Sequence, residues 1–349
     1  MRSGVIDLRS DSVTLPPSEM LEAMGRAQLG DDVYGEDPTV NRLEEMAAEL
    51  LGMDAALLVP SGTMANLLAL MAHCPRGTKL LVGDRSDLWL WEAGGASVLG
   101  GLVYHPIPTQ PNGELAIADL DAAIFAQDDS QCAIVRLISV ENTHCLCGGR
   151  VLRLDYLERL ESFARERGLA LHLDGSRIFN AAVALDRPVR EIAAHVDSVS
   201  FCLSKGLAAP IGSMLTGSRE FIADARRLRK MVGGGMRQAG VIAAAGIFAL
   251  QSMIQRLAED HANARRLAAG LAAVPGLRLD PLIPETNMVF WTLEDSDLPV
   301  EVFVRALEHR GVRVLELGKG RLRAIPHFGI TADHIDIAVE AVAGALQER

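Results

Sequence analysis

Apolar runs of strand length recur along the chain, and amphipathic stretches separate most of them. This alternation predicts an α/β fold with a mostly parallel sheet flanked by helices. From residue 275 onward, short strands and two helices indicate a smaller α+β unit. The predicted strands are 55–60, 79–83, 132–141, the run that ends at Asp174, 196–202, 287–292, 311–315 and 322–326. The predicted helices are 38–52, a helix that opens near 62, 154–167, 218–230, a long apolar helix that ends near 270, 300–310 and 332–347.

The same pattern predicts the domain organisation. Residues 1–17 are largely polar and end in two prolines, so we expect an extended or irregular N-terminal arm. We expect a large domain over 18–250 and a small C-terminal domain over 251–349. The 349 residues of the chain are enough for two domains and a sizeable core.

Composition narrows the range of partners. The net charge is −11, whereas nucleic acids and anionic membranes attract clustered Lys and Arg, so we expect neither as a partner. The chain starts without a hydrophobic signal segment, and no stretch approaches the roughly 18 apolar residues of a membrane span. The five cysteines make an odd, sparse set that indicates free thiols in a reducing compartment, and we expect a cytoplasmic protein.

Two polar side chains stand at the ends of apolar strands. Lys205 follows the run 196–202, and Asp174 closes a strand in the segment LALHLDGSRIFN. Strand carboxyl ends form the ligand crevice of an open α/β sheet, so both side chains should meet there. A partly desolvated lysine can lose its proton and form an imine with a carbonyl group, and a carboxylate that keeps a pyridine nitrogen protonated is the second requirement of pyridoxal phosphate (PLP) chemistry. A solvated surface lysine is the alternative.

An anion site is predicted nearby. Ser61, Gly62 and Thr63 stand between a predicted strand and a predicted helix. The unpaired N–H groups and the dipole at a helix start favour an anion, so this segment predicts a phosphate cup. Ser-Gly-Thr is also an ordinary helix start, and that alternative stays open at this point. Dinucleotide and P-loop glycine patterns are missing from strand-turn-helix context, which argues against a nucleotide.

Several segments of the chain together resemble one known family. They are DLRSDSVT, GDDVYGEDPTVNRLE, VPSGTMAN, ENTH followed by GGR, HLDGSRIFN, FCLSKGLAAPIGS and GGGMRQAGVIAAAG. In these segments the sequence is similar to the low-specificity L-threonine aldolases, and the resemblance covers residues 6–327. It implies the PLP-dependent transferase fold type I, PLP as cofactor, and cleavage of a β-hydroxy-α-amino acid to glycine and an aldehyde.

The resemblance also implies which residues bind the cofactor. Lys205 would carry PLP, Asp174 would pair with its ring nitrogen, and the cup at 61–63 would bind its phosphate. Arg237 matches a family arginine near the phosphate of the neighbouring subunit. That position implies a homodimer or homotetramer with active sites shared between subunits.

The substrate carboxylate has its own set of residues in the family. Ser10 matches a serine that hydrogen-bonds this carboxylate, and Arg323 matches the carboxylate-binding arginine, with Arg321 as a register alternative. Arg177 would contact the cofactor or the same carboxylate. A planar guanidinium fixes a carboxylate through two contacts, so these residues would choose which Cα bond breaks.

At two positions the chain departs from the family. Threonine aldolases have a histidine that stacks on the PLP ring at the position of Asp87, and a second one near the substrate hydroxyl at the position of Gln131. We expect Asp87, or a water that it orients, to act as base for the substrate hydroxyl, with Gln131 also at the substrate. A plain helix N-cap is the alternative for Asp87. A carboxylate there also suggests a preference for a β-hydroxy amino acid with a basic side chain over L-threonine.

The two missing histidines leave other reactions open. A β-eliminating lyase, a transaldolase or a racemase would use the same PLP scaffold. A catalytically silent protein of this fold is a further alternative, but it would require the loss of Lys205, Asp174 or the phosphate cup. His144 with Cys145 and Cys147 has no second ligand pair nearby, so we expect no metal site.

Overall fold

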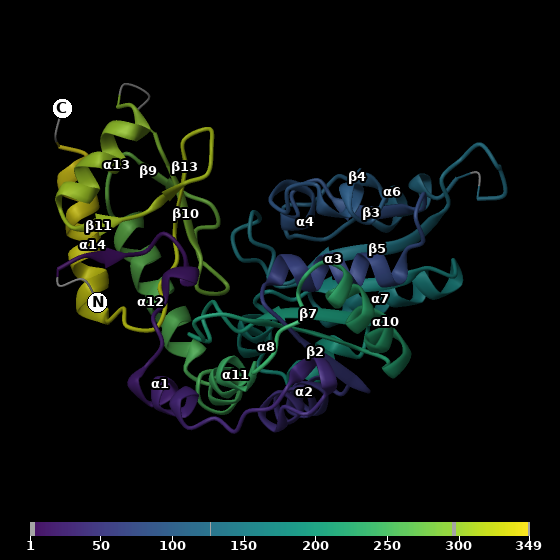
Figure 1. The fold of residues 1–349 in the computed structure, drawn as a ribbon. Coiled ribbons are helices and arrows are strands. Elements are labelled where there is room, and N and C mark those ends of the chain that lie inside the picture. Colours follow the sequence, from purple (N-terminus) through teal and green to yellow (C-terminus); the bar gives the residue numbers. More distant parts are fainter. Residues whose placement is uncertain (1–3, 126, 295–297, 348–349) are drawn as a thin grey trace.

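The computed structural model describes residues 4–125, 127–294 and 298–347. A larger α/β unit lies beside a smaller unit built from residue 257 onward, and the N-terminal arm runs along the smaller unit (Figure 1). The helices of the larger unit are α1 Ser18–Gly25, α2 Pro38–Leu51, α3 Gly62–His73, α4 Asp87–Leu90, α5 Gly95–Val98, α6 Ile117–Ala123, α7 Leu154–Glu166, α8 Ile178–Leu185, α9 Val189–Ala193, α10 Arg219–Met231 and α11 Gly240–Ser252.

Seven strands form the large sheet, in the order β2-β8-β7-β6-β5-β3-β4. They are β2 Ala55–Val59, β3 Lys79–Gly83, β4 Val103–Ile107, β5 Val135–Glu141, β6 Ala170–Asp174, β7 Ser198–Cys202 and β8 Ser213–Gly217. Only β8 runs antiparallel to its neighbours, and the other described pairs are parallel. The predicted α/β fold with a mostly parallel sheet is therefore confirmed.

Helices cover both faces of this sheet because successive strand residues point to opposite sides. Leu57 packs with α3 and α10, whereas the adjacent Leu58 packs in the core that contains α2, α7, α8 and α11. Capping residues fix the helix ends: the Asp37 carboxylate accepts from the N–H groups at the start of α2, and Gly52 ends that helix in the left-handed conformation.

The smaller unit contains a four-stranded antiparallel sheet in the order β12-β13-β10-β9. Its strands are β9 Leu277–Leu279, β10 Val289–Leu293, β12 Leu315–Glu316 and β13 Arg321–Ala324, and its helices are α12 Leu257–Ala272, α13 Val300–His309 and α14 Ala332–Ala345. In the arm, β1 Ile6–Asp7 pairs in parallel with β11 Val312–Arg313, and a 3-10 turn follows at Asp11–Val13. Ile6 and Leu8 are buried in the core of the smaller unit, so the arm is tied to it.

One predicted helix is wrong. The long apolar helix expected to end near 270 is two helices, α11 and α12, with a 70° bend between them. The break at 253–256 contains neither Gly nor Pro, so the sequence carries no local signal for it. Within the described ranges no single helix is long and apolar enough to cross a membrane, and α11 and α12 reach that length only as a bent pair.

Candidate active site

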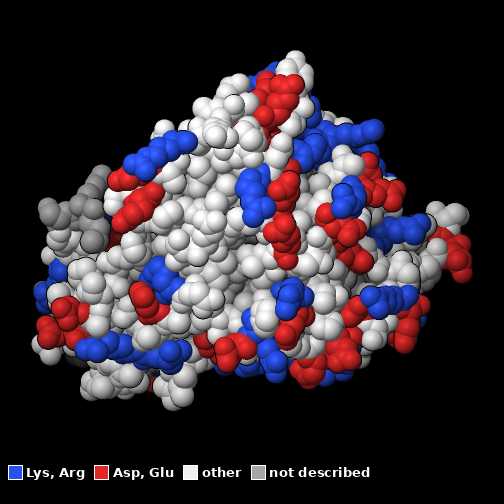
Figure 2. Space-filling model, turned by 90° about the horizontal axis from the view of Figure 1, so that it is seen from below, with Lys and Arg blue, Asp and Glu red and all other residues white. Residues whose placement is uncertain are grey.

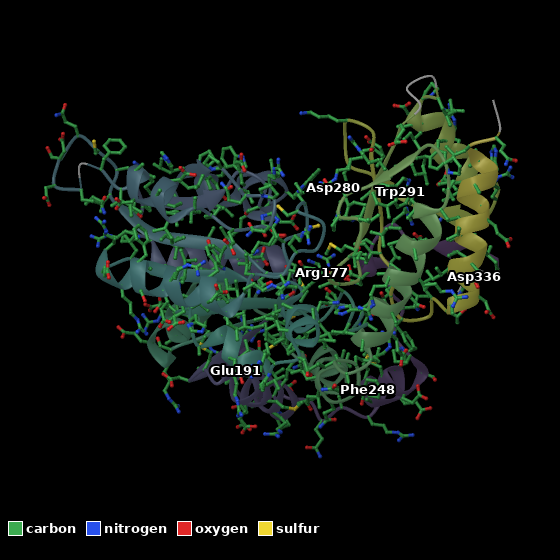
Figure 3. All side chains as sticks on the ribbon, turned by 180° about the vertical axis from the view of Figure 1, so that it is seen from behind. Arg177, Glu191, Phe248, Asp280, Trp291 and Asp336 are labelled. Carbon is green, nitrogen blue, oxygen red and sulfur yellow. The ribbon has the colours of Figure 1, made fainter. Side chains whose placement is uncertain are left out.

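Four neighbouring strands deliver polar residues to one edge of the large sheet. In the order β7-β6-β5-β3, the chain continues from β7 into Lys205, β6 ends at Asp174, β5 ends at Glu141, and Asp87 follows β3. Glu141 and Asp174 lie directly opposite each other in the β5–β6 register. The carboxyl ends of parallel strands therefore collect these groups as the sequence predicts. Arg177, just after β6, lies where the large unit faces the small unit that carries Asp280 and Trp291 (Figure 3).

Asp174 and Lys205 lie in one electrostatic environment. Asp174 is 2% exposed, and its two carboxylate oxygens accept hydrogen bonds from Asn66 Nδ2 and the Ser176 N–H, each at 3.0 Å. Burial alone would lower the pKa of Lys205, but attraction to Cys202, and then to Asp174, raises it overall. The amine and the carboxylate thus interact electrostatically at the same edge of the sheet.

A buried ion pair ties the N-terminal arm to this edge. Arg177 donates from Nε and Nη2 to the two carboxylate oxygens of Asp11, at 2.8 and 2.6 Å, and both side chains are almost fully buried. Burial opposes the charge of Asp11, but Arg177 outweighs it and lowers the pKa of Asp11 strongly. Ser10 precedes Asp11 and accepts from the Ser12 N–H at 3.2 Å, so it caps the 3-10 turn of the arm. This pair brings Ser10 and Arg177 together.

Arg323 reaches the same region from the smaller unit. Its Nη1 donates to Cys145 Sγ and its Nη2 donates to the Arg9 carbonyl, both at 3.2 Å. Its Nε is buried and has no hydrogen-bond partner among the described residues. Arg321 instead donates to the Leu146 carbonyl at 2.6 Å, so the structure brings Arg323, and not Arg321, to the arm.

The predicted phosphate cup is the start of α3. Ser61 Oγ accepts from the Met64 N–H at 3.2 Å and caps the helix. The N–H groups of Gly62 and Thr63 belong to the first turn, where no intrahelical acceptor exists. A Cβ at Gly62 would lie 2.8 Å from Cys202 Sγ, so only glycine brings this backbone close to the end of β7. The cup therefore adjoins the strand that leads to Lys205.

Asp87 begins the short helix α4, but Ser86 is the N-cap. The alternative of a plain N-cap at Asp87 is therefore wrong. The Asp87 N–H donates to Glu141 Oε2 at 2.9 Å. Burial and then repulsion from Asp174 raise the pKa of Asp87, and burial followed by repulsion from Asp87 and Asp174 raises that of Glu141 well above its ordinary value. Burial and Asp174 also raise the pKa of Glu92, to about 8. Carboxyl groups with raised pKa values exchange protons readily near neutral pH.

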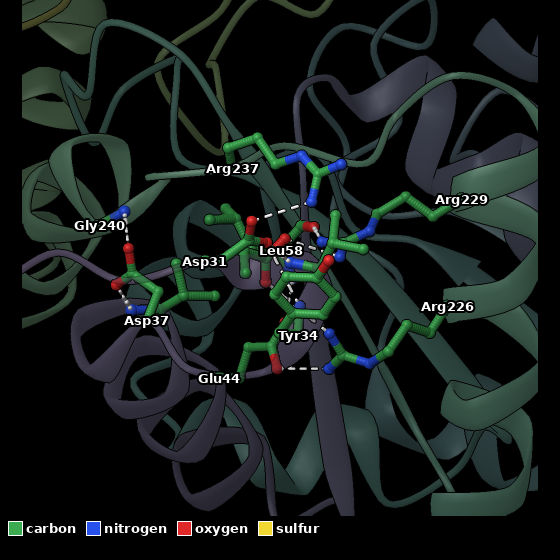
Figure 4. A network of polar contacts seen from close by, with 12 residues as sticks. Asp31, Tyr34, Asp37, Glu44, Leu58, Arg226, Arg229, Arg237 and Gly240 are labelled. Atoms are coloured by element: carbon green, nitrogen blue, oxygen red, sulfur yellow. Dashed lines mark hydrogen bonds and ion pairs between the residues drawn. The ribbon is translucent and has the colours of Figure 1, made fainter.

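Two predicted site residues, Gln131 and Arg237, lie away from the cluster around Asp174 and Lys205 of the same subunit. Gln131 is exposed, its backbone N–H and its side chain both donate to Asp129, and it precedes the amino end of β5, opposite to Glu141. Arg237 is also exposed. It donates to Asp31 at 2.9 Å and lies near the Tyr34 ring, on the surface beside the ion pairs of α10 (Figure 4). The structure does not bring Gln131 or Arg237 to Lys205 of the same chain.

Sequence reasoning missed four residues that contact the cluster. Asp11, Asn66 and Glu92 carried no recognised signal, although the first two stand inside segments that resemble the family. Glu141 closes a predicted strand, which is the signal that identified Asp174. The cysteines near His144 have unrelated partners, since Cys145 contacts Arg323 and Cys147 donates to the Gln110 carbonyl. No cluster of metal-ligating side chains is found in the described part of the chain.

Comparison with known proteins places the chain in a family. A profile of the beta-eliminating lyase family matches residues 7–296. The low specificity L-threonine aldolase of Escherichia coli K12 is 50% identical over 342 residues, which cover 97% of this chain and 96% of that protein. The low-specificity L-threonine aldolase 1 of Arabidopsis thaliana is 42% identical and covers 99% and 97%.

A solved structure shares the fold. The threonine aldolase of Leishmania major superposes with a TM-score of 0.82 at 22% identity, over 96% of this chain and 98% of that one. The predicted fold type and the predicted family are thereby confirmed. The chain belongs to the beta-eliminating lyase family and, within it, to the group of the low-specificity L-threonine aldolases.

Proposed function

We propose that the protein is a PLP-dependent carbon-carbon lyase. It cleaves the Cα–Cβ bond of a β-hydroxy-α-amino acid, such as threonine, allo-threonine or a bulkier or cationic analogue, to glycine and an aldehyde. The observation that carries the proposal is that Lys205 and Asp174 follow or end adjacent strands at the same edge of the large sheet and interact electrostatically, with the start of α3 beside β7. The names of the curated relatives support the same reaction.

The residues present fit PLP. The amine of Lys205 suits its aldehyde, the buried carboxylate of Asp174 suits its ring nitrogen, and the N–H groups at 61–63 suit its phosphate. When bound, PLP supplies an electron sink for the electron pair of the broken Cα–Cβ bond.

Arg177 and Arg323 hold the substrate carboxylate. Asp11 occupies Nε and Nη2 of Arg177 and fixes the plane of that guanidinium. The buried, unpaired Nε of Arg323 needs an acceptor, and a carboxylate provides one. Ser10 lies beside this pair and adds a hydroxyl. With the carboxylate fixed, the Cα–Cβ bond is the one aligned for cleavage.

Asp87 accepts the β-hydroxyl proton, directly or through a water that it orients. Its raised pKa makes it a stronger base than an ordinary aspartate, because burial and Asp174 both disfavour its charge. Gln131 lies at the opposite end of β5 from Glu141, so in the proposed assembly it contacts substrate only in the site of a second subunit.

The active site is shared between subunits of a homodimer or homotetramer. Arg237 lies on the surface beside the ring of Tyr34, which is 72% exposed, and Met231 at the end of α10 is 73% exposed. Large exposed apolar side chains beside an arginine are typical of a protein interface. In the assembly Arg237 faces the cofactor phosphate of the neighbouring subunit.

A screen of β-hydroxy-α-amino acids for glycine release tests the proposed function. Aldol cleavage gives glycine and an aldehyde in equal amounts, and Lys205→Ala should abolish both. A keto acid and ammonia without glycine would instead identify a β-eliminating lyase and overturn the proposal.

A further inference from the structure

A chain of buried hydrogen bonds runs from α3 across the sheet to Asp174. His73 Nε2 contacts Ser198 Oγ at 2.8 Å, and this oxygen contacts His172 Nδ1, also at 2.8 Å. His172 Nε2 contacts Asn66 Oδ1 at 3.3 Å, and Asn66 Nδ2 contacts Asp174 Oδ2 at 3.0 Å. All of these residues are buried except His73, which is half-buried at the end of α3.

The amide of Asn66 can face only one way. Its Nδ2 lies between two carboxyl groups, Asp174 and Glu92, at 3.0 and 2.8 Å. Its Oδ1 accepts from Ser200 Oγ at 2.6 Å. The opposite orientation would set the amide oxygen against the carboxylate of Asp174 and leave that acceptor without this donor.

This orientation fixes the position of every proton along the row of hydrogen bonds. Because Asn66 Oδ1 is an acceptor, His172 must carry its proton on Nε2, which leaves Nδ1 to accept from the Ser198 hydroxyl. Ser198 Oγ then accepts from the Nε2–H of His73. Each donor therefore points along this row of hydrogen bonds toward Asp174. The bond dipoles add, with their positive ends toward the carboxylate.

Both imidazoles contribute as neutral dipoles. Burial lowers the pKa of His172 to about 3 and that of His73 to about 4. The His73 ring also stacks on Phe221 at a centroid distance of 4.4 Å, which holds its plane. The row of hydrogen bonds thus stabilises a negative charge on Asp174 without placing a second charge in the core.

We propose that Asn66, His172, Ser198 and His73 are positioning residues that aim one aligned row of hydrogen-bond dipoles at Asp174. The row keeps this carboxylate charged and oriented, so that an aromatic ring nitrogen bound at Asp174 stays protonated. This inference rests on the proposed function, because it assumes that the pyridine ring of PLP binds there.

The sheet offers a matched pair of variants. Ser198 and Ser139 both lie opposite His172, on the two strands that flank β6, and both are buried. Ser198 Oγ is part of the chain, whereas Ser139 Oγ has no hydrogen-bond partner among the described residues. Ser198→Ala therefore interrupts the row of hydrogen bonds. Ser139→Ala removes a buried hydroxyl and leaves that row intact.

The test is the nitrogen NMR signal of the ring in holoenzyme loaded with ¹⁵N-labelled PLP. We expect a protonated-pyridine signal in the wild type and in Ser139→Ala. Ser198→Ala removes both hydrogen bonds of this hydroxyl, and we expect a shift toward the neutral-pyridine value and PLP binding weaker by about threefold to tenfold, an effect of the size of one hydrogen bond. Identical signals in all three proteins would overturn the inference, while a wild type that binds no PLP would overturn the proposed function instead.

A second pair covers the case in which Ser198→Ala does not fold. His73 is half-buried, so His73→Leu and His73→Gln should both be tolerated. The glutamine amide can still donate to Ser198, and leucine cannot. We expect the ring-nitrogen signal to shift in the leucine variant and to return to the wild-type position in the glutamine variant. An equal response of the two variants would contradict the proposal.

Discussion

At position 87 this chain carries an aspartate where the resemblance implies a histidine. Burial and the carboxylate of Asp174 raise the pKa of Asp87, whereas the positive charges of Lys205 and Arg177 oppose that shift. By our proposal the arginines hold the substrate carboxylate and the lysine holds the cofactor. We therefore expect a cation on the β-substituent of the substrate to pair with Asp87.

We predict that a β-hydroxy-α-amino acid with a guanidinium or ammonium side chain is cleaved with a higher kcat/KM than L-threonine. Asp87→Ala and the isosteric Asp87→Asn should each reduce this preference by about tenfold or more, because a desolvated charge-assisted contact is lost. The measurement is the ratio of the two kcat/KM values in each protein. A ratio that the substitutions leave unchanged would remove Asp87 from substrate selection.

Glu92 predicts a pH dependence of stability. Its pKa is raised from 4.5 to about 8 in the folded apoprotein, so the folded state binds a proton that the unfolded state has lost. The stability that Glu92 contributes is complete below its unfolded pKa and is lost as the pH rises through its folded pKa. As the pH rises from the unfolded to the folded pKa of Glu92, the free energy of unfolding of Glu92→Gln should therefore increase relative to that of the wild type. Denaturant unfolding of both apoproteins at these two pH values measures the difference in their free energies of unfolding. A difference that does not change with pH would contradict the raised pKa of Glu92.

The local sequence of the N-terminal arm gives no sign of its long-range contact with the larger unit. Its polar residues predict an irregular segment, and in residues 4–17, which the structure describes, β1 and one 3-10 turn are the only regular structure. Asp11 ties the arm to the larger unit, and its partner Arg177 stands 166 positions along the chain. A contact at that separation leaves no local pattern, so only the family resemblance pointed to this arm.

We predict that Asp11→Ala destabilises the protein by about 3–5 kcal/mol, because it leaves the Arg177 guanidinium buried without its counter-charge. Asp7→Ala removes the partly exposed pair with Arg9 from the same arm and should cost at most about 1 kcal/mol. Equilibrium unfolding of the two variants gives the comparison. Equal losses would show that the Asp11–Arg177 pair is not the anchor of the arm.

Most strands of the large sheet were predictable because each is an apolar run bounded by polar or glycine residues. β3 matches its prediction at 79–83, and β5 and β7 begin only a few residues later than expected. The break between α11 and α12 was not predictable, since the apolar pattern continues through it. At the site, the strand-end residues Lys205 and Asp174 could be found from sequence, whereas Asn66 depends on side-chain contacts across the sheet.

At the scale of the whole molecule, charge gives no single-sign surface on the face seen in Figure 2, where acidic and basic side chains are interspersed. The domain boundaries at 17 and 250 stay a prediction. Ile6 of the arm joins the core of the smaller unit, and Leu257, the first residue of α12, joins the core of the larger one. The site thus draws residues from both units and, by our proposal, from a second subunit.

Shared active sites predict complementation between inactive variants. Lys205→Ala and Arg237→Ala should each have little activity alone. Co-expressed as mixed oligomers, they should form some sites with both residues intact and recover part of the wild-type rate. Arg227→Ala, an exposed arginine on α10, should be active by itself and serves as the control for surface charge. Mixed oligomers without activity would contradict a shared site.

The central claim is that Lys205 bonds covalently to PLP opposite Asp174. Borohydride reduction of the holoenzyme followed by peptide mass analysis tests this directly. We predict that the visible absorbance of the cofactor disappears and that the added mass is found on the peptide with Lys205, in the wild type but not in Lys205→Ala. Added mass on another lysine, or none in PLP-saturated wild type, would contradict the account.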